Sequence, residues 1–463
     1  MGGGRVLVAA AVAVLVTANP AHALPPGFAQ QANALLAHSY PADGPGASVV
    51  ITEHGKIVYE GIRGLADVGA KRPITPATVF RLGSITKQFA SATVLQLAAE
   101  GKLNLSDPIA KYLPGYPNGQ AITVAELLNH TSGIQDYTEI PGWMIEANTG
   151  RPYTTQQLIA VFKDLPPPSK PGEKWAYNNS GYILVGAVIE AVTKKPWYEA
   201  VEERILRPLG LSTIRYGVDE PRIAAMATGY TKTKEGVAQS MKIDMSVPGA
   251  AGALVGTPAD LAAWADALHH GKVLAPAYYQ RMIAPTRLPD GSTVPYAFGL
   301  ENGEVRGHPT IGHSGGIFGF VTDSLYLPRE DLFIAVFTNS DSPQTSVETT
   351  TRRLAAMAIG APYPTFSGLP FDVKKVGPML GVYKFKDAER IFGMRKGKLF
   401  TKRSDGDEMP VFYAGHDRFF YGPGELSWFA IRRDAHGKFL FERHADGAED
   451  IDLGVRTRAV PIR

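Results

Sequence analysis

The 463-residue chain contains no cysteine, which excludes disulfide bonds, a thiol nucleophile and a cysteine-linked lipid anchor. Its stability must therefore come from its core. The apolar run at residues 6–16 is too short to span a bilayer, and no later uncharged apolar run reaches that length. The net charge of only +3 gives no argument for a nucleic-acid partner. Metal-ligand spacing such as H-E-x-x-H is also missing, so we assign no metal and no cofactor.

The N-terminus has the features of a signal peptide. Arg5 precedes the short apolar run, which is followed by Asn19-Pro20 and by the small-x-small sequence Ala21-His22-Ala23. We expect residues 1–23 to be removed after Ala23. The mature protein would then be exported, to the periplasm or the medium, without a stable membrane anchor.

The remaining composition, 44% hydrophobic and 20% charged, is that of a globular protein of two or three domains. The apolar patterns predict an opening helix, a hairpin, a long helical region, further strands and a closing helix. These segments are, in that order, Phe28–Ser39; Ala47–Glu53 and Lys56–Arg63; Val124–Leu128, Thr155–Phe162, 182–192, 197–205 and Pro258–His269; 297–300, 319–327 and 332–339; and 347–359. Strands at both ends with a helical insert between them indicate an α/β or α+β domain whose cleft lies between the two parts.

A second domain is predicted at the C-terminus. Residues 360–365, Gly-Ala-Pro-Tyr-Pro-Thr, have the composition of a linker, and short aromatic-rich alternating runs follow. We expect a larger first domain over residues 24–362 and a small antiparallel β-barrel or β-sandwich over residues 363–463.

The most informative stretch begins at Phe80 and places Ser84 and Lys87 three residues apart at the start of a predicted helix that ends at Gly101. Residues three apart share a helix face, so the two side chains should be neighbours. The helix carries no charge from Gln88 to Ala99, which indicates burial. Burial would lower the pKa of Lys87 and allow it to take a proton from Ser84 near neutral pH.

Two further motifs follow in order, Tyr177-Asn178-Asn179 and His313-Ser314-Gly315-Gly316. Together the three motifs, S-x-x-K, Y-x-N and H-x-G, resemble those of the serine β-lactamase-like hydrolases, over nearly all of residues 28–360. That family includes class C β-lactamases, D-Ala-D-Ala carboxypeptidases, D-aminopeptidases and esterases. The resemblance implies a β-lactamase/transpeptidase-like α+β fold with an antiparallel sheet and a helical insert. The tail likewise resembles the lipocalin-like C-terminal domains of some members.

The resemblance also implies roles for individual residues. Ser84 would be the nucleophile, Lys87 its activating partner and Tyr177 a second proton-transfer group. Lys87 and Tyr177 can share the task of activating Ser84 if Lys87 keeps the phenol pKa low. Asn179 would orient the substrate amide, and the backbone N–H groups of Ser84 and Gly316 would form an oxyanion hole. His313, Ser314, Gly315 and Gly316 would form the strand that binds substrate, where the glycines allow close approach. The base of each half-reaction stays open.

His313 bears on the choice of substrate. Class C enzymes that resemble this chain have Lys-Thr-Gly where His313-Ser314-Gly315 stands, and histidine is mostly neutral at pH 7. The resemblance therefore favours a small-molecule or peptide substrate with a D-residue, peptidoglycan included, as in D-Ala carboxypeptidases or D-aminopeptidases. A β-lactamase or short-chain esterase is the alternative within the family. A non-catalytic protein that captures penicillin or peptidoglycan is the alternative of another class. The oligomeric state stays open.

Several short matches compete with these assignments. Residues 312–316 also fit the G-x-S-x-G elbow of α/β-hydrolases, with Ser314 as nucleophile and His416, His436 or His444 as its histidine, but the residues that follow have a strand pattern instead of a helix. We interpret Tyr116-Pro117-Asn118 as a turn, and His130-Thr131-Ser132-Gly133 as a capped turn. His269 and His270 would complement the dipole at a helix end.

Overall fold

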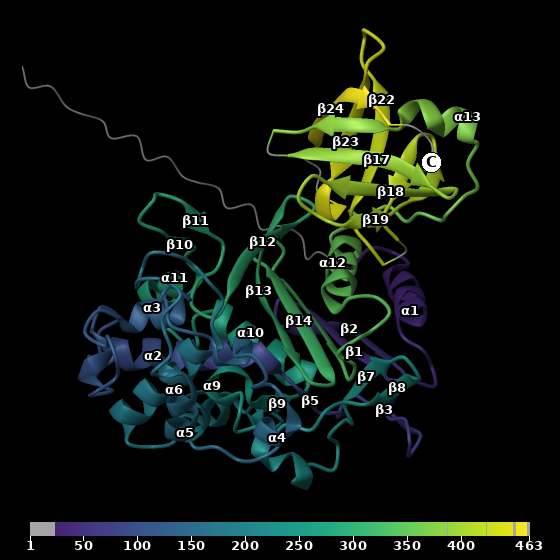
Figure 1. Cartoon of the computed structure of the whole chain (residues 1–463). Coiled ribbons are helices and arrows are strands. Elements are labelled where there is room, and N and C mark those ends of the chain that lie inside the picture. Colours follow the sequence, from purple (N-terminus) through teal and green to yellow (C-terminus); the bar gives the residue numbers. More distant parts are fainter. Residues whose placement is uncertain (1–23, 387, 423, 448–450, 461–463) are drawn as a thin grey trace, which may run out of the picture.

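A six-stranded antiparallel sheet is the central element of the first 360 residues (Figure 1). The computed structural model describes residues 24–460 except 387, 423 and 448–450, so the predicted signal peptide lies outside the described residues. The strand order is β12-β13-β14-β15-β1-β2. The strands are β1 (Ala47–Glu53), β2 (Lys56–Arg63), β12 (Glu301–Val305), β13 (His308–Ile317), β14 (Phe320–Leu327) and β15 (Leu332–Thr338).

The N-terminal hairpin of this sheet pairs with the strand that is last in sequence. Ala47 opposes Thr338 and Glu53 opposes Leu332, so β1 lies between β2 and β15. All seven residues of β1 and of β15 are buried. They are buried because helices cover both faces of the sheet, which explains their nearly continuous apolar sequences.

Two helices far apart in sequence cover one face of the sheet. They are α1 (Phe28–Ser39) and α12 (Val347–Ala358), which contact each other and the strands beneath them. Phe28 and Leu36 of α1 and Leu354 of α12 share a buried cluster with Val49 and Ile334 of the sheet. Each helix therefore contributes one apolar stripe to a common layer.

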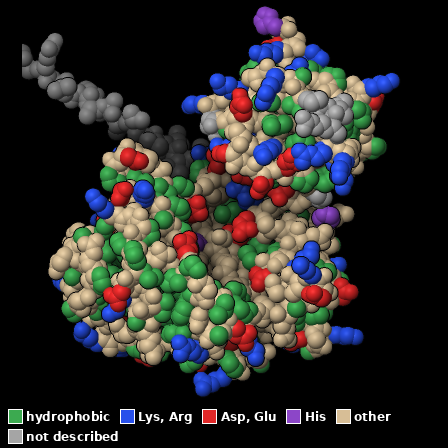
Figure 2. Space-filling model, in the orientation of Figure 1, with side chains coloured by type: hydrophobic (Ala, Val, Ile, Leu, Met, Phe, Trp, Pro, Cys, Tyr) green, Lys and Arg blue, Asp and Glu red, His purple; other side chains and the backbone are tan. Residues whose placement is uncertain are grey.

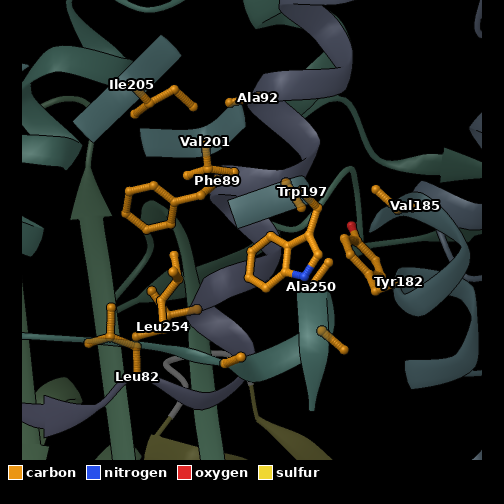
Figure 3. Packing of buried hydrophobic residues seen from close by; sticks show 14 of the residues in the cluster. Leu82, Phe89, Ala92, Tyr182, Val185, Trp197, Val201, Ile205, Ala250 and Leu254 are labelled. Atoms are coloured by element: carbon orange, nitrogen blue, oxygen red, sulfur yellow. The ribbon is translucent and has the colours of Figure 1, made fainter. Parts of the chain in front are cut away.

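The helical part covers the other face. Its largest core cluster surrounds α2 (Thr86–Ala99), whose residues from Thr86 to Leu95 are all buried. Figure 3 shows Phe89 and Ala92 of this helix among Trp197, Val201 and Leu254, which come from elements far away in the sequence. The remaining helices are α3 (Val124–Leu128), α4 (Glu146–Thr149), α5 (Thr155–Phe162), α6 (Asn179–Thr193), α7 (Trp197–Val201), α8 (Arg207–Leu209), α9 (Gly249–Gly252), α10 (Pro258–His269) and α11 (Pro276–Ile283), with tighter or wider turns at η1 (Gly83–Ile85), η2 (Ile109–Lys111), η3 (Tyr137–Glu139), η4 (Glu202–Leu206) and η5 (Gly217–Arg222).

Four small sheets connect these layers. They are β3 (Leu65–Asp67) with β4 (Arg72–Pro73), β5 (Phe80–Arg81) with β9 (Leu254–Gly256) and β6 (Arg215–Tyr216), β7 (Tyr230–Thr233) with β8 (Gly236–Gln239), and β10 (Thr286–Arg287) with β11 (Thr293–Val294). The sheet that contains β5 matters most, because β5 leads directly into the turn that carries Ser84. No helix in the described part of the chain has the length and apolarity that a membrane crossing requires.

The C-terminal part is a nearly closed antiparallel barrel of nine strands, reached through α13 (Val373–Val376) and η6 (Gly377–Met379). Its order is β19-β18-β17-β16-β24-β23-β22-β21-β20, so the two edge strands follow each other in sequence. Aromatic rings fill its interior, with Phe429 stacked 5.0 Å from Phe419 and 4.1 Å from Phe441 between ring centroids. The strands are β16 (Gly381–Lys384), β17 (Glu389–Arg395), β18 (Lys398–Arg403), β19 (Glu408–Pro410), β20 (Phe412–Gly415), β21 (Arg418–Phe420), β22 (Trp428–Arg433), β23 (Phe439–His444) and β24 (Asp452–Ala459).

The barrel contacts the preceding part of the chain beside α12, as Figure 1 shows. Leu426 packs into the cluster that α1 and α12 share, and the Arg353 guanidinium donates to the Glu425 carbonyl at 3.0 Å. Both contacts lie on the side of the sheet opposite the helical part.

The predicted α+β fold with an antiparallel sheet, a helical insert and an all-β tail is confirmed. The strand expected at residues 297–300 is wrong: the chain turns there, with Gly299 at φ 72° and Ala297 N–H bonded to the Leu300 carbonyl at 2.7 Å. The strand begins at Glu301 instead. Residues 312–316, expected before a strand, lie inside β13.

Candidate active site

The turn η1 brings Ser84 from the small sheet into the start of α2. Leu82 N–H donates to the Leu254 carbonyl of β9 at 2.9 Å, and Leu254 N–H donates to the Thr86 hydroxyl at 3.0 Å. Gly83 has φ 54°, a conformation that glycine adopts easily. A Cβ on Gly83 would lie 3.0 Å from Gly316 N, so the turn and β13 are in close contact.

Lys87 is fully buried one turn further along, and its amine contacts three oxygens. Nζ lies 3.0 Å from Ser84 Oγ, 3.0 Å from Asn179 Oδ1 and 2.9 Å from the Ala251 carbonyl. The amide oxygen and the carbonyl can only accept. A neutral amine has two N–H groups for these two acceptors, so its lone pair is left for the Ser84 hydroxyl proton.

The electrostatics favour this neutral form. Burial lowers the pKa of Lys87 to about 7, and the negative charge of Asp136 partly opposes the effect. Near neutral pH a large fraction of the amine is therefore unprotonated, as expected from the uncharged sequence of the helix. Lys87 has both the geometry and the pKa of a base for Ser84.

The ring of Tyr177 faces the Lys87 amine, and its phenol pKa differs from expectation. Lys87 Nζ stands 4.7 Å from the centroid of the Tyr177 ring, over its face. Burial raises the pKa of the Tyr177 phenol, and a hydrogen bond with Ser84 only partly opposes this. The condition that Lys87 keeps this pKa low is therefore not met, because burial dominates. At pH 7 the phenol is protonated and can donate.

Asn179, the first residue of α6, is held by a buried carboxylate that the sequence analysis did not identify. Asp136 Oδ2 accepts from Asn179 N at 2.8 Å and from Asn179 Nδ2 at 3.1 Å. Nδ2 also lies 3.3 Å from Thr138 Oγ1. Because the NH₂ end faces these oxygens, the Oδ1 end must face Lys87. The signal in the sequence was weak: an aspartate before a short turn, where it caps η3.

Strand β13 approaches the Ser84 turn closely at Gly315 and Gly316. A Cβ on Gly315 would lie 2.1 Å from the Leu82 carbonyl oxygen, whereas one on Gly316 would meet nothing within 4 Å. Gly315 is thus required for packing, and Gly316 leaves open space beside Ser84. Ser84 and Gly316, the two residues of the predicted oxyanion hole, both line one pocket.

His313 is buried behind Tyr177 and does not line that pocket. Its Nδ1 lies against the Ser314 carbonyl and its Nε2 is 2.9 Å from the Tyr296 hydroxyl. Burial and the charge of Lys87 lower the pKa of His313 to about 3. A neutral ring with Nδ1–H donating to the carbonyl and Nε2 accepting from Tyr296 satisfies both contacts. The Ser314 side chain is exposed and is also outside the pocket lining.

Aromatic rings pack around these residues, and His130 lies among them. Its ring centroid is 4.4 Å from that of Tyr177 and 4.5 Å from that of Tyr296, and its Nδ1 accepts from Asn178 N at 3.1 Å. Burial lowers the pKa of His130 well below its usual value. The predicted turn at His130, which has φ 64°, thus also supports the tyrosine that stands beside Ser84.

The competing sequence matches do not form sites. Residues 312–316 lie within a strand that turns into another strand, so Ser314 is not at a strand-to-helix elbow, and His416, His436 and His444 belong to the barrel. Tyr116-Pro117-Asn118 is a turn, as predicted. His269 does not complement a helix dipole, because burial lowers its pKa to about 3 and it stacks 3.9 Å from Tyr326. Among the described residues, no group of three or more His, Asp or Glu side chains is placed to hold a metal ion.

The pocket beside Ser84 has a volume of about 470 Å³. Figure 2 shows the surface hollowed between the helical part and the sheet, with acidic side chains around the hollow. Among the described residues that line the pocket itself there is no lysine or arginine, and Asp341 is the one carboxylate. The lining residues are Gly83, Ser84, Tyr137, Thr138, Met144, Tyr177, Asn179, Ile243, Pro248, Ala251, Gly252, Gly316, Ile317, Phe318, Phe320, Val321 and Asp341.

Comparison with known proteins gives one family and several relatives. The model of the Beta-lactamase family matches residues 35–358. Penicillin-binding protein 4* of Bacillus subtilis (strain 168) is 24% identical over 89% of this chain and 95% of its own. The D-aminopeptidase of Gluconobacter oxydans (strain 621H) is 25% identical over 69% of this chain and 60% of its own. The structure of a D-stereospecific amidohydrolase from Streptomyces sp. is 29% identical, with a TM-score of 0.61, and covers 73% of this chain and 98% of that one.

Proposed function

The chain belongs to the Beta-lactamase family, and we propose that it hydrolyses amide bonds whose acyl part contains a D-amino acid. Ser84 carries the acyl group. The observation that supports the chemistry best is the buried, largely neutral amine of Lys87 at 3.0 Å from Ser84 Oγ. A D-aminopeptidase and a D-stereospecific amidohydrolase among the relatives support the substrate class.

In the acylation step, Lys87 acts as the base. It takes the Ser84 proton as Oγ attacks the substrate carbonyl, and the N–H groups of Ser84 and Gly316 bind the developing oxyanion. When the C–N bond breaks, the protonated Tyr177 phenol donates a proton to the leaving nitrogen. Lys87 returns a proton to Tyr177, so the site is neutral again after the amine leaves.

In the deacylation step, water takes the place of the amine. Lys87 removes its proton as the water oxygen attacks the ester carbonyl, and Ser84 Oγ leaves with that proton. Asn179 keeps the Lys87 amine aligned with Ser84, because its amide oxygen contacts Lys87 Nζ and its NH₂ group donates to Asp136. No cofactor takes part in either step.

The charges of the site support amides over carboxylate-bearing substrates. A β-lactam or a D-Ala-D-Ala peptide carries a carboxylate next to the scissile bond, and such a group needs a cation. His313 is neutral and turned inward, and the lining residues that the structure describes include no lysine or arginine. The charge of Glu301 acts on Tyr177 and would repel a carboxylate on the leaving side.

A D-Ala carboxypeptidase is the second candidate, because Penicillin-binding protein 4* matches almost its whole length. A slow or absent release of a penicillin adduct would favour it. We also propose export with cleavage after Ala23, which would bring either enzyme to its substrate outside the cytoplasm.

Intact-mass measurement with a fluorophosphonate probe tests the nucleophile. Wild type and Ser314→Ala should each gain one adduct, and Ser84→Ala should gain none. Adduct formation on Ser84→Ala would refute the assignment. Hydrolysis of D-alanine p-nitroanilide against its L-enantiomer, nitrocefin, p-nitrophenyl acetate and a D-Ala-D-Ala peptide then ranks the substrates. A labelled Ser84 without turnover of any of them would indicate a binding protein.

A further inference from the structure

Asp341 is a carboxylate in the pocket that the hydrolytic steps do not use. It follows the end of β15 by three residues and lines the same pocket as Ser84 and Gly316. A charged side chain in a pocket whose lining is otherwise neutral and partly apolar fixes the charge of the ligand that fits there.

Neutral hydrogen-bond donors hold this carboxylate in place. Asp341 Oδ2 accepts from Gly319 N at 2.9 Å, and Oδ1 accepts from Ser342 Oγ at 2.7 Å. Its backbone N–H bonds to the Tyr230 carbonyl at 3.0 Å. A carboxylate has about four acceptor sites, so each oxygen can accept a further bond from a ligand.

The guanidinium of Arg81 reaches the turn between β13 and β14, but it is already paired. Arg81 donates to the Phe318 carbonyl at 3.2 Å, but its guanidinium forms two bonds to Glu220 at 2.8 and 2.9 Å. This ion pair contributes no net charge at that end of the pocket. The apolar side chains of Ile317, Phe318 and Phe320 line the same pocket, and apolar surroundings strengthen the field of a carboxylate.

The position of Asp341 assigns it to the acyl part of the substrate. The leaving group must lie toward Tyr177, which donates to it, and Tyr177 stands near His313 at one end of this stretch of β13. The acyl part then extends the other way, from Gly316 toward Gly319. These residues are three apart, so at most about 10 Å of chain separates them, and Asp341 Oδ2 lies 2.9 Å from Gly319 N.

We propose that Asp341 binds an ammonium group in the acyl part of the substrate and so selects D-substrates that carry a free amine. The proposal rests on the proposed function, whose substrate it narrows. The ammonium can be the N-terminus of a D-amino acid or short D-peptide, or a basic side chain. A separation of that order matches the reach of one or two residues together with the hydrogen bond from their ammonium group.

The test compares amine-bearing substrates with acetylated counterparts in wild type, Asp341→Asn and Asp290→Asn. Asparagine keeps an oxygen for Gly319 N–H and removes the charge, and Asp290, in an exposed turn, controls for the loss of one charge. The substrates are the p-nitroanilides of D-Ala, D-Ala-D-Ala and Nα-acetyl-D-Lys, each with its fully acetylated form.

Asp341→Asn should lower kcat/KM for the amine-bearing member of at least one pair by about 10- to 100-fold, the usual range for a bond to a charged group. The acetylated member and Asp290→Asn should change less than about threefold. The pair that responds identifies which amine Asp341 binds. An equal loss on both members would mean that Asp341 only supports the β13–β14 turn, and no loss on any pair would also overturn the proposal.

A binding measurement separates this proposal from the proposed function. The same compounds compete with fluorophosphonate labelling of Ser84, which requires occupancy of the pocket but no turnover. Amine-bearing compounds should protect wild type better than their acetylated forms, and Asp341→Asn should lose the difference. If amine-bearing compounds protect better but none of the compounds is hydrolysed, only the proposed function is refuted. If both forms protect wild type equally, the role of Asp341 is refuted.

Discussion

Replacement of Lys87 by methionine should change how the stability of the protein depends on pH. Methionine has a similar length and no charge, so it fits the buried site without an ammonium to desolvate. In wild type the folded pKa of about 7 lies far below the usual value of 10.5. Between these values the unfolded chain binds a proton at Lys87 that the folded protein does not bind, so wild-type stability rises with pH.

The size of the effect follows from the shift. Each unit is worth about 1.4 kcal/mol, so this group costs the fold roughly 4 kcal/mol at pH 7 and about 2 kcal/mol at pH 9. Wild type should therefore gain about 2 kcal/mol over Lys87→Met between pH 7 and pH 9. The difference in free energy of unfolding between wild type and Lys87→Met at pH 7 alone does not test the pKa, because the variant also leaves the Asn179 and Ala251 oxygens without the Lys87 donor.

Urea unfolding followed by tryptophan fluorescence at pH 7 and pH 9 measures this difference. Four of the five tryptophans, Trp143, Trp175, Trp197 and Trp264, lie in the catalytic part, so its transition dominates the signal. Every other titrating group is common to both proteins and cancels. Lys56→Met, at an exposed position of β2, controls for the loss of a surface lysine. A change below about 0.5 kcal/mol, or one of opposite sign, would show that Lys87 is not neutral near pH 7.

Three further predictions concern the surroundings of Ser84. Gly315→Ala should abolish fluorophosphonate labelling without unfolding the protein, as judged by circular dichroism, because its Cβ would lie 2.1 Å from the Leu82 carbonyl oxygen. Gly316→Ala, whose Cβ would meet nothing within 4 Å, is the matched control for folding. Asp136→Asn should slow labelling about tenfold by misorienting Asn179, and should shift the pH midpoint of labelling to lower pH, because the charge of Asp136 raises the pKa of Lys87; an unchanged midpoint would contradict this. Burial raises the pKa of Asp323 to about 7, so the folded protein holds a proton that the unfolded chain loses above pH 4. Urea unfolding should show Asp323→Asn gaining roughly 2 to 3 kcal/mol over wild type from pH 5 to pH 8, and a flat difference would refute that titration.

The sequence predicted those elements whose signal is local. The helix at Phe28–Ser39 and the hairpin of β1 and β2 have the predicted bounds, because apolar periodicity and the His54-Gly55 turn lie within each segment. Segment 297–300 failed for a nonlocal reason. It is apolar because it packs against α2, where a Cβ on Gly299 would lie 2.8 Å from the Lys87 carbonyl oxygen, and it is a turn instead of a strand.

The candidate site divides in the same way. The spacing of Ser84 and Lys87 predicted their contact because both lie on one helical turn. Asp136 and Tyr296 could not be found from the sequence, since they act on Asn179 and His313 across 43 and 17 residues of chain. The pKa of Tyr177 depends on how completely several distant segments bury its ring, and no local pattern reports that.

The central sheet also determines when the protein can fold. Strand β1 lies between β2 and β15, and its register joins Ala47 to Thr338. At synthesis rates of about 5 to 20 residues per second, roughly 15 to 60 seconds separate the translation of these two partners. Until then the hairpin has no neighbour on its inner edge, and the core on both faces stays open. Such high contact order slows folding. The chain therefore stays unfolded for longer, and an unfolded chain can pass through a translocation channel, which suits the export that we propose.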